Sequence, residues 1–304
     1  MIRLNIHNEM SPLHSVILGR ADSNGGTPTI EEAYDPKSIE HIKAGTYPAE
    51  DDMVKELEGF REVLEKYGVK VYRPELLEDT NQIFARDLGF VIGDKFVVSN
   101  MIPNREHEQD AIGYLLDEIS GDKRIQMPES ARIEGGDVIV HGDFIFVGTY
   151  SKPDFNEIKT ARTNREAVEL LKQFFPGKEV RPFDLIKSMT NARENALHLD
   201  CCFQPVGEKY AVIYPGGFSD KADVDFLVSL FGRENILFID KEDMYNMSSN
   251  FFSIRPDVVV SETRLDKLND WLRSKGITVE AIPYYEIGKQ EGLLRCSTLP
   301  LYRE

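Results

Sequence analysis

A unit of two short apolar runs, a helical stretch and a third apolar run recurs about five times along the 304 residues of this chain. The first two runs flank a Gly-Asp or Gly-Glu turn, which predicts β-hairpins in GFVIGDKFVVSN (89–100), VIVHGDFIFVGTY (138–150) and CFQPVGEKYAVIYP (202–215). Repeated units bury their apolar faces against one another. The repeat therefore favours an α/β fold in which the units close around a centre. A doubly wound sheet is the alternative, but its parallel strands need crossovers where this chain has hairpins.

The helical stretches and the third runs complete each unit. Apolar residues between Val54 and Leu64 recur at the spacing of one helix face. The third runs, such as VKVYRP (69–74) and ITVEAIP (277–283), are typical of strands. No linker divides the chain, so we predict a single domain over residues 1–304. The predicted helices are Asp51–Tyr67, Glu106–Ile119, Thr163–Phe175, Lys221–Phe231 and Thr263–Lys275.

One segment, residues 21–51, does not follow the repeat. It is rich in Gly, Pro, Thr and Asp, and it shows little periodicity. It is also too long for an ordinary connection within a compact domain. We therefore predict an irregular functional loop or lid there, rather than a domain boundary.

A polar residue opens each hairpin. These residues are Asp87, Asp137, Asp200, Asn250 and Cys296, and they are separated by 50, 63, 50 and 46 positions. If the units are equivalent, the five side chains converge on the central axis from the starts of strands. Burying three carboxylates, an amide and a thiol together is costly unless they meet a charged or polar partner. The pattern predicts a central site that binds a cation.

Charge and cysteine content exclude several classes of function. The net charge of −16 argues against general affinity for nucleic acid or anionic membranes. No apolar run has the length of a membrane span or of a signal-peptide core. The cysteines Cys201, Cys202 and Cys296 form no disulfide framework, which predicts a reducing cytoplasm. Neither they nor the six histidines have metal-ligand spacing, so we expect no metal.

Four motifs resemble those of the guanidino-modifying pentein superfamily, which contains arginine deiminases, amidinotransferases and dimethylarginine dimethylaminohydrolases. Each motif is short, and their joint order and spacing make the match specific. The resemblance runs from about Asn81 to the C-terminus, with a weaker echo in HSVILGR (14–20). It implies a five-bladed, pseudo-symmetric ββαβ propeller and an enzyme without cofactors. The motifs are NQIFARD (81–87), EGGD (134–137), HLD (198–200) and GLLRCSTLPLYR (292–303).

The resemblance assigns the catalytic residues. It makes Cys296 the nucleophile that attacks a guanidinium carbon, and the bound cation itself favours the thiolate. His198 would protonate the leaving group and then activate water, and Glu134 would orient His198. Free cysteines are more often buried packing residues, and this is how we interpret Cys201 and Cys202.

The resemblance also assigns substrate contacts. Asp87 and Asp200 would hold the guanidinium by paired hydrogen bonds. Asn81 has the place of an Asn in the deiminase pattern, six residues before the Asp. Asp137 is interpreted as a supporting group of the same network. Such acids also serve as turn or cap residues, which is the competing interpretation of each.

Three further residues concern the substrate's far end. Arg105 and Arg162 resemble the deiminase arginines that bind the α-carboxylate, although the second match requires an insertion, SKPDFNEIKTA (151–161). Asn250 is expected to contact the polar end of the substrate. A solvated surface arginine and a turn asparagine are the competing interpretations.

We therefore expect a cysteine hydrolase that cleaves a carbon–nitrogen bond of arginine or an arginine-like guanidino compound through a covalent thiouronium intermediate. An amidinotransferase is the first alternative, because only the acceptor differs. A non-catalytic propeller that binds a small molecule is the second. The chain lacks the extra helical domain and GGG-rich segment of arginine deiminases, yet it has the HxD pattern that dimethylarginine hydrolases usually lack. The leaving nitrogen and any homo-oligomer stay open.

Overall fold

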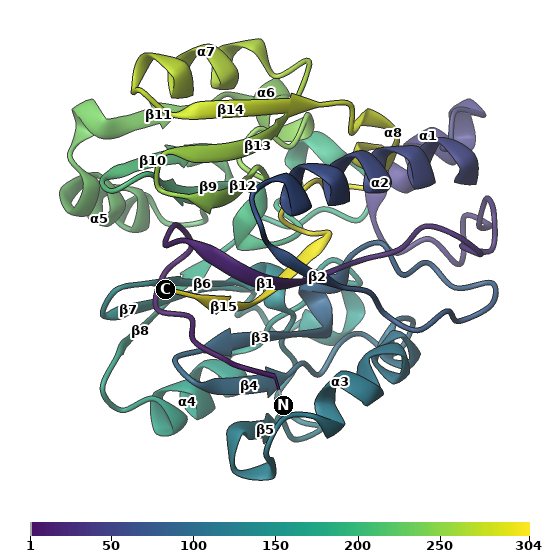
Figure 1. The fold of residues 1–304 in the computed structure, drawn as a ribbon, viewed down its shortest axis with the longest axis horizontal. Helices are drawn as coiled ribbons and strands as arrows, with labels where there is room; N and C mark the ends of the chain where they lie inside the picture. Colours follow the sequence, from purple (N-terminus) through teal and green to yellow (C-terminus); the bar gives the residue numbers. More distant parts are fainter. Residues whose placement is uncertain (1) are drawn as a thin grey trace.

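Five three-stranded sheets surround a common centre in the computed structural model, which describes residues 2–304 (Figure 1). In each sheet two strands pair antiparallel and a third pairs parallel to the middle one. The predicted five-bladed ββαβ architecture is confirmed. Four sheets are formed by consecutive strands: β3 (Gly89–Ile92), β4 (Lys95–Val98) and β5 (Arg124–Gln126); β6 (Val138–His141), β7 (Phe144–Thr149) and β8 (Glu179–Asp184); β9 (Phe203–Val206), β10 (Tyr210–Ile213) and β11 (Ile236–Phe238); β12 (Phe252–Arg255), β13 (Val258–Glu262) and β14 (Thr278–Ile282).

The fifth sheet joins the two ends of the chain. Strand β15 (Thr298–Arg303) pairs antiparallel with β1 (Leu13–Leu18), and β2 (Lys70–Tyr72) pairs parallel to β1. The pairing closes the ring of sheets, because β15 follows the fourth consecutive sheet in sequence and β1 precedes the first. It also brings Cys296, two residues before β15, to the same central end of its sheet as the other polar residues.

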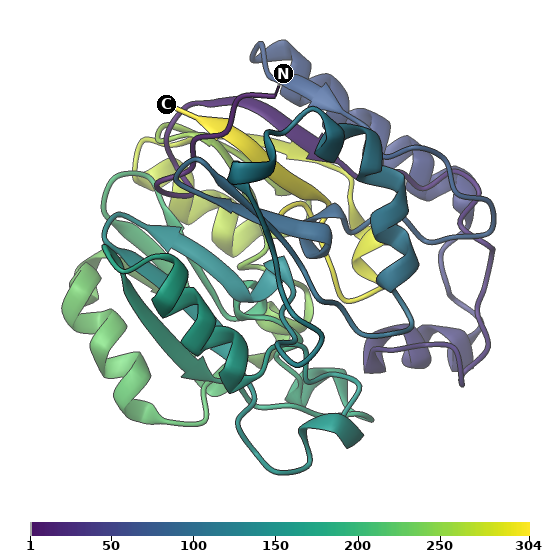
Figure 2. The same ribbon diagram turned by 90° about the horizontal axis from the view of Figure 1, so that it is seen from below.

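The longer helices lie on the outside of the ring, between the second and third strands of each unit (Figures 1 and 2). Their apolar faces explain this position: in α2 (Glu50–Lys66) the side chains of Leu57, Phe60 and Leu64 are fully buried. Burying each such side chain contributes about 1.5–3 kcal/mol. The other predicted helices that form are α4 (Arg165–Phe174), α5 (Lys221–Phe231) and α7 (Asp266–Ser274).

The predicted helix Glu106–Ile119 is only partly correct. A 3₁₀ helix, η2 (Glu106–Ile112), leads into a single short α-helix, α3 (Gly113–Asp117). Gly113 is a poor helix former, which agrees with the change of helix type at that residue. No helix among residues 2–304 combines the length and apolar character that a membrane crossing requires.

The segment 21–51, predicted to be irregular, contains the helix α1 (Pro36–Ala44). The signals for this helix stand in the sequence: Asp35 accepts a hydrogen bond from the backbone of Ser38, Pro36 occupies the first turn, and Gly45 ends the helix at a φ of 66°. The remaining short helices are α6 (Lys241–Tyr245), α8 (Tyr285–Gly288), η3 (Gly121–Lys123), η5 (Phe155–Glu157), η6 (Ala192–Glu194), η8 (Pro215–Gly217) and η9 (Arg233–Asn235).

Three 3₁₀ turns at the centre carry the polar residues of the repeat. They are η1 (Ala85–Leu88), η4 (Gly135–Asp137) and η7 (Leu199–Cys201), and they lead into β3, β6 and β9. Turn η4 packs against both η1 and η7. The repeat therefore places Asp87, Asp137 and Asp200 together, as the sequence predicted.

Candidate active site

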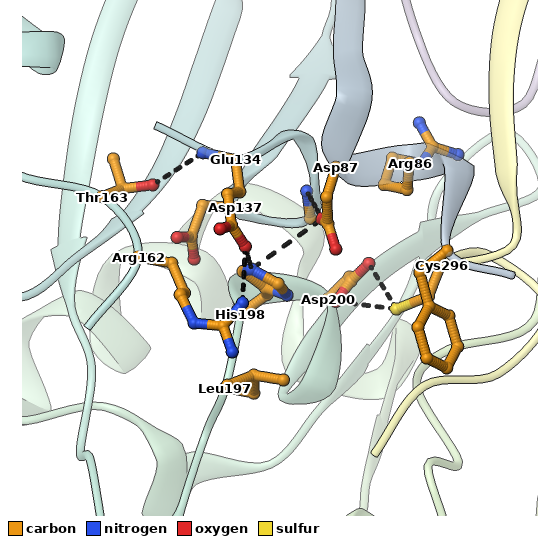
Figure 3. Close-up of polar contacts among 12 residues, drawn as sticks. Arg86, Asp87, Glu134, Asp137, Arg162, Thr163, Leu197, His198, Asp200 and Cys296 are labelled. Carbon is orange, nitrogen blue, oxygen red and sulfur yellow. Dashed lines mark hydrogen bonds and ion pairs between the residues drawn. The ribbon is translucent and has the colours of Figure 1, made fainter. Parts of the chain in front are cut away.

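Asp87, Asp137, Asp200 and Cys296 meet in a buried cluster at the centre of the propeller (Figure 3), and the fifth polar residue of the repeat, Asn250, contacts Cys296 there. The exposed fractions are 3% for Cys296, 2% for Asp87 and 0% for Asp137, Asp200 and Asn250. The site is therefore closed to solvent, and every charge in it must be met by another protein group or by a ligand.

Cys296 lies beside Asp200. Its Sγ atom is 3.6 Å from Oδ2 and 3.9 Å from Oδ1 of that carboxylate. Burial raises the pKa of the Cys296 thiol well above its ordinary value, and the negative charges of Asp200 and Asp87 raise it further. Without a bound cation the thiol therefore keeps its proton at neutral pH. A cation between the two carboxylates would lower the pKa of the thiol again.

Asn250 fixes the position of the thiol. Its Nδ2 donates to Sγ of Cys296 at 3.2 Å, and its Oδ1 accepts from the backbone N–H of Cys296 and of Leu293, both at 3.1 Å. The sequence placed Asn250 at the polar end of the substrate. In the structure its two polar atoms are bound to the segment that carries the cysteine.

Asp200 is held by an arginine that the sequence analysis did not single out. Nη1 of Arg295 donates to Oδ2 of Asp200 at 2.7 Å, and Nη2 is 3.1 Å from Oε1 of Glu9. All three side chains are buried. Glu9 comes from the N-terminal segment, and this distance along the chain explains why sequence spacing could not reveal the pair.

His198 forms an ion pair with Glu134. The distance from Nε2 to Oε2 of Glu134 is 2.9 Å, and the distance to Oδ1 of Asp87 is 3.8 Å. Burial opposes the charged imidazolium, but Asp87, Glu134 and Asp137 outweigh it and raise the pKa of His198. His198 can therefore carry a proton near neutral pH, as a general acid requires.

The HLD motif lies at the start of a short 3₁₀ turn. Residues Leu199–Cys201 form the 3₁₀ turn η7, with His198 directly before it. Both side chains of the HLD motif still reach the site, because His198 contacts Glu134 and Asp200 contacts Cys296.

Two arginines neutralise the carboxylates around His198. Nη1 of Arg162 donates to Oε2 of Glu134 at 2.8 Å, and Nη1 of Arg105 donates to Oδ2 of Asp87 at 2.7 Å. Although burial acts in the opposite direction, Arg162 and His198 hold the pKa of Glu134 well below its usual value. The prediction that Arg105 and Arg162 bind a substrate carboxylate stays a prediction, and in the structure both are paired with acids of the site.

Two of these carboxylates and the imidazole of His198 are close enough together to bind a metal ion. One ligand atom from each of Asp87, Glu134 and His198 lies within 4.8 Å of the others. Arg105 and Arg162 already supply positive charge to the two carboxylates. This pairing favours an acid–base role for the cluster.

Asp137 and Lys187 anchor the backbone on both sides of His198. Oδ1 of Asp137 accepts from the N–H of Leu199 at 3.0 Å, and Nζ of Lys187 donates to the carbonyls of Ala196 and Leu197 at 2.8 and 2.6 Å. Burial raises the pKa of Asp137, and its Oδ2 has no hydrogen-bond partner among the described residues. Its position agrees with the predicted supporting role.

Asn81 lies apart from this cluster. Its Nδ2 donates to Oε1 of Gln290 at 2.6 Å, and its Oδ1 accepts from the backbone of Ile83 at 3.2 Å. Asn81 lines a cavity next to the buried site instead of the site itself. The neighbouring Arg86 is bound to the segment that carries the cysteine: its Nε donates to the carbonyl of Arg295 and its Nη2 donates to Oγ1 of Thr298, each at 3.3 Å.

Gly136 permits the close approach of His198 and Asp87, two groups of the candidate site. A Cβ atom at this position would lie 2.6 Å from Nδ1 of His198 and 3.0 Å from Oδ1 of Asp87. Real side-chain contacts are not this short, so any larger residue must displace one of the two groups. A displacement of about 1 Å at a catalytic group lowers the rate about 10²-fold.

We expect Gly136→Ala to lower kcat about 100-fold, because the new methyl group displaces His198 or Asp87. Gly113→Ala is the matched control, because a Cβ atom there meets nothing within 4 Å. Steady-state kinetics of both proteins check the prediction. Equal activity of the two variants would show that the site tolerates the shift.

Comparison with known proteins identifies the family. The sequence model of eukaryotic N,N-dimethylarginine dimethylhydrolases matches residues 40–265. The chain belongs to this family. This family is part of the guanidino-modifying pentein superfamily that the motifs indicated. Relatives of the chain include arginine deiminases.

Two relatives show the range of sequence similarity. The uncharacterized protein YkgA of Bacillus subtilis is 30% identical over 223 residues, which cover 73% of this chain and 70% of that protein. The arginine deiminase of Oenococcus oeni is 24% identical over 282 residues, which cover 79% of this chain and 65% of the deiminase. The chain thus spans just under two thirds of the deiminase.

Solved structures share the fold. The N-terminal domain of ArgZ, a cyanobacterial arginine dihydrolase crystallised with its product, superposes with a TM-score of 0.78 at 18% identity and covers 95% of this chain and 97% of that one. The inosamine-phosphate amidinotransferase StrB1 of Streptomyces griseus gives a TM-score of 0.77 at 19% identity, with coverage of 100% and 97%. Hydrolytic and transferase members are therefore both built on this propeller.

Proposed function

We propose that the protein is a cysteine hydrolase that cleaves a carbon–nitrogen bond of arginine or an arginine-like guanidino compound. The observation that carries the proposal is the arrangement of Cys296 and His198 on opposite sides of two carboxylates, Asp87 and Asp200 (Figure 3). A planar guanidinium between these carboxylates would present its carbon to the sulfur and one nitrogen to the imidazole.

Charge explains how the first step begins. The pKa of Cys296 is raised by burial and by the two aspartates. A bound guanidinium offsets those negative charges, so the thiol releases its proton to solvent as the substrate binds and regains one when the product leaves. The thiolate then adds to the guanidinium carbon, protonated His198 gives its proton to the departing nitrogen, and a thiouronium remains on Cys296.

Water completes the cycle in the hydrolase. Neutral His198 removes a proton from water, the resulting hydroxide attacks the thiouronium carbon, and the thiolate of Cys296 leaves. Glu134 keeps the imidazole oriented through both proton transfers, because Arg162 holds the same carboxylate oxygen that contacts His198. We further propose that residues 21–51 form the lid of the site and that the protein works in the reducing cytoplasm, where Cys296 stays a free thiol.

The amidinotransferase is the second candidate, because an amidinotransferase, StrB1, is built on the same propeller as the dihydrolase ArgZ. Its chemistry is the same up to the thiouronium, after which an amine replaces water. The assay therefore supplies arginine with and without glycine or lysine. Product formed only when an acceptor amine is present would identify a transferase.

A covalent adduct tests the proposal directly. The protein is mixed with arginine, quenched in acid within a single turnover, digested and weighed by mass spectrometry. We expect added mass on the peptide that carries Cys296. An amidino fragment shows that the amino-acid tail has left, whereas a heavier adduct shows that the tail is retained. Absence of any adduct at Cys296 during turnover contradicts the mechanism.

A further inference from the structure

Glu291 is a buried residue with an unusual backbone conformation, five residues before Cys296. Its φ is 57°, which lies in the left-handed region. Residues other than glycine rarely adopt this conformation. It is unfavourable for them and persists only where the surrounding structure holds it. Contacts of the Glu291 side chain must therefore offset this strain.

The carboxyl group of Glu291 joins the two segments that carry the proposed catalytic residues. Its Oε1 accepts from Nδ2 of Asn195 at 2.7 Å, and both side chains are buried. Asn195 lies three residues before His198. Its own Oδ1 accepts from the backbone N–H of Ser188 at 3.0 Å, which fixes the direction of the amide. One buried hydrogen bond thus connects the histidine segment to the cysteine segment.

The same carboxyl group reaches helix α1, within the region that we propose as a lid. Its Oε2 accepts from the backbone N–H of Lys37 at 3.4 Å, in the first turn of that helix. Asp35, which caps the helix, is a further neighbour, because its carboxylate acts on the pKa of Glu291 through its charge and through a hydrogen bond. Glu291 therefore contacts three segments that are far apart in the sequence.

The first turn is the buried end of helix α1. Residues 36–38 are buried, whereas residues 43–45 at the other end are exposed. Nζ of Lys37 also holds this turn, because it donates to the carbonyl of Tyr245 at 2.5 Å. Interactions of exposed side chains contribute little in comparison. Glu291 thus lies at the end of the helix where contacts with the rest of the molecule are strongest.

The surroundings of Glu291 favour its protonated form. Burial raises the pKa of Glu291 well above its usual range, and the carboxylate of Asp35 raises it further, while Asn195 and Lys37 act in the opposite direction. A protonated carboxyl group has one donor and keeps acceptor capacity. It can therefore donate to Asp35 and accept from Asn195 at the same time, without repulsion between two carboxylates.

We propose, on the basis of the proposed function, that Glu291 is a positioning residue that couples closure of helix α1 over the site to the alignment of Cys296 and His198. Asn250 holds the far end of the cysteine segment, because its Oδ1 accepts from the backbone N–H of Cys296. Glu291 holds the near end, and its carboxyl group is the part of that end that meets the helix. The lid and the nucleophile are therefore connected through one side chain.

Departure of helix α1 changes the surroundings of Glu291. Water then reaches the carboxyl group, and a hydrogen bond in contact with water is weaker than a buried one. The contacts that hold the φ of 57° are lost as well, so residues 291–296 are free to take other conformations. The two catalytic residues are consequently aligned when the lid is closed and misaligned when it is open.

Three substitutions at Glu291 test the role of its carboxyl group, with arginine as substrate. Glu291→Gly and Glu291→Ala both remove the group, and we expect each to lower kcat about 10- to 100-fold, because the catalytic groups lose their alignment. Glycine relieves the strained φ and alanine keeps it, so agreement between the two assigns the effect to the carboxyl group. Glu291→Gln retains a donor and an acceptor, and its kcat should lie within about threefold of wild type.

Glu65→Ala is the matched control, because it removes an exposed acid on helix α2 and should leave kcat and KM within about twofold of wild type. Activity of Glu291→Gly and Glu291→Ala equal to that of the control would overturn the proposal. So would a Glu291→Gln protein as impaired as Glu291→Gly. If the glycine and alanine variants do not fold, Asn195→Ala breaks the same hydrogen bond from the histidine side and takes their place.

Hydrogen exchange measured by mass spectrometry tests the coupling without an assay of activity. In Glu291→Gly, the amides of residues 36–44 and of residues 291–296 should exchange at least about tenfold faster than in wild type. In Glu291→Gln both segments should exchange at wild-type rates. Helix α5 should be unchanged in every variant. Faster exchange confined to residues 291–296 would show that Glu291 does not hold the helix, and would overturn the coupling.

The two proposals fail in different ways. If the wild-type protein turns over no arginine and forms no adduct on Cys296, the proposed function fails, and the exchange rates alone decide whether Glu291 joins helix α1 to residues 291–296. If the wild-type protein is active, and Glu291→Gly is equally active with unchanged exchange in helix α1, the proposed function stands and only the coupling is wrong.

Discussion

Cys296→Ala should lose at least about 10⁴-fold in kcat, because removal of a catalytic nucleophile leaves only substrate binding and polarisation by the remaining groups. The same protein should show no covalent adduct in an acid-quench experiment. Its fold should survive, since alanine removes only one buried sulfur atom, and the expected cost is about 1 kcal/mol. Circular dichroism and thermal unfolding check the fold alongside the kinetic assay.

Cys201→Ala is the informative control for this experiment. The Sγ of Cys201 lies 3.8 Å from Oδ1 of Asp200, and the Sγ of Cys296 lies 3.9 Å from the same atom. Both thiols are buried and both have raised pKa values. Asn250 donates to Cys296, and on this ground we expect Cys201→Ala to stay active. Loss of the adduct in Cys201→Ala with its retention in Cys296→Ala would make Cys201 the nucleophile.

The repeat allowed the centre of the fold to be predicted, because equivalent units place equivalent residues at equivalent positions. This is why Asp87, Asp200 and Cys296 could be brought together without any knowledge of their contacts. The repeat has no information about side chains outside it. Glu9 and Arg295 are 286 residues apart, and only the closure of the ring places them side by side.

Local geometry limited the prediction of details. Asp200 lies in a 3₁₀ turn and His198 lies directly before it, and hydrophobic periodicity does not detect such a turn. The helix α1 was missed although its capping residues are visible in the sequence, because its apolar pattern is weak. The roles of Arg105 and Arg162 depend on ion pairs that form only in the folded chain.

The charges in the buried cluster should make the rate of the proposed reaction depend on pH. Burial and the carboxylates of Asp200 and Asp87 raise the pKa of the Cys296 thiol, and the carboxylates around His198 raise the pKa of its imidazole against the opposing effect of burial. Both shifts follow from the same acids, since negative charge disfavours a thiolate and favours an imidazolium. A change in one carboxylate should therefore alter the acid–base behaviour of the whole site.

Glu134→Gln should lower kcat about 10²- to 10⁴-fold at neutral pH, because the neutral amide no longer stabilises the imidazolium of His198. The raised pKa of His198 should fall in this variant, so the alkaline limb of the kcat profile should move to lower pH. A pH–rate profile measures the shift. Glu157→Gln, an exposed substitution, should leave the profile unchanged.

The same substitution should destabilise the fold, because it leaves Arg162 buried with one fewer charge partner. Loss of one member of a buried pair costs about 3–5 kcal/mol. The pKa of Glu134 is lowered in the folded protein, so its contribution is present above the ordinary carboxyl pKa and fades as the pH falls through the lowered value. Urea unfolding should therefore show a large difference between wild type and variant at pH 7 and a smaller one in acid. A constant difference across this range would show that Glu134 acts through packing and not through its charge.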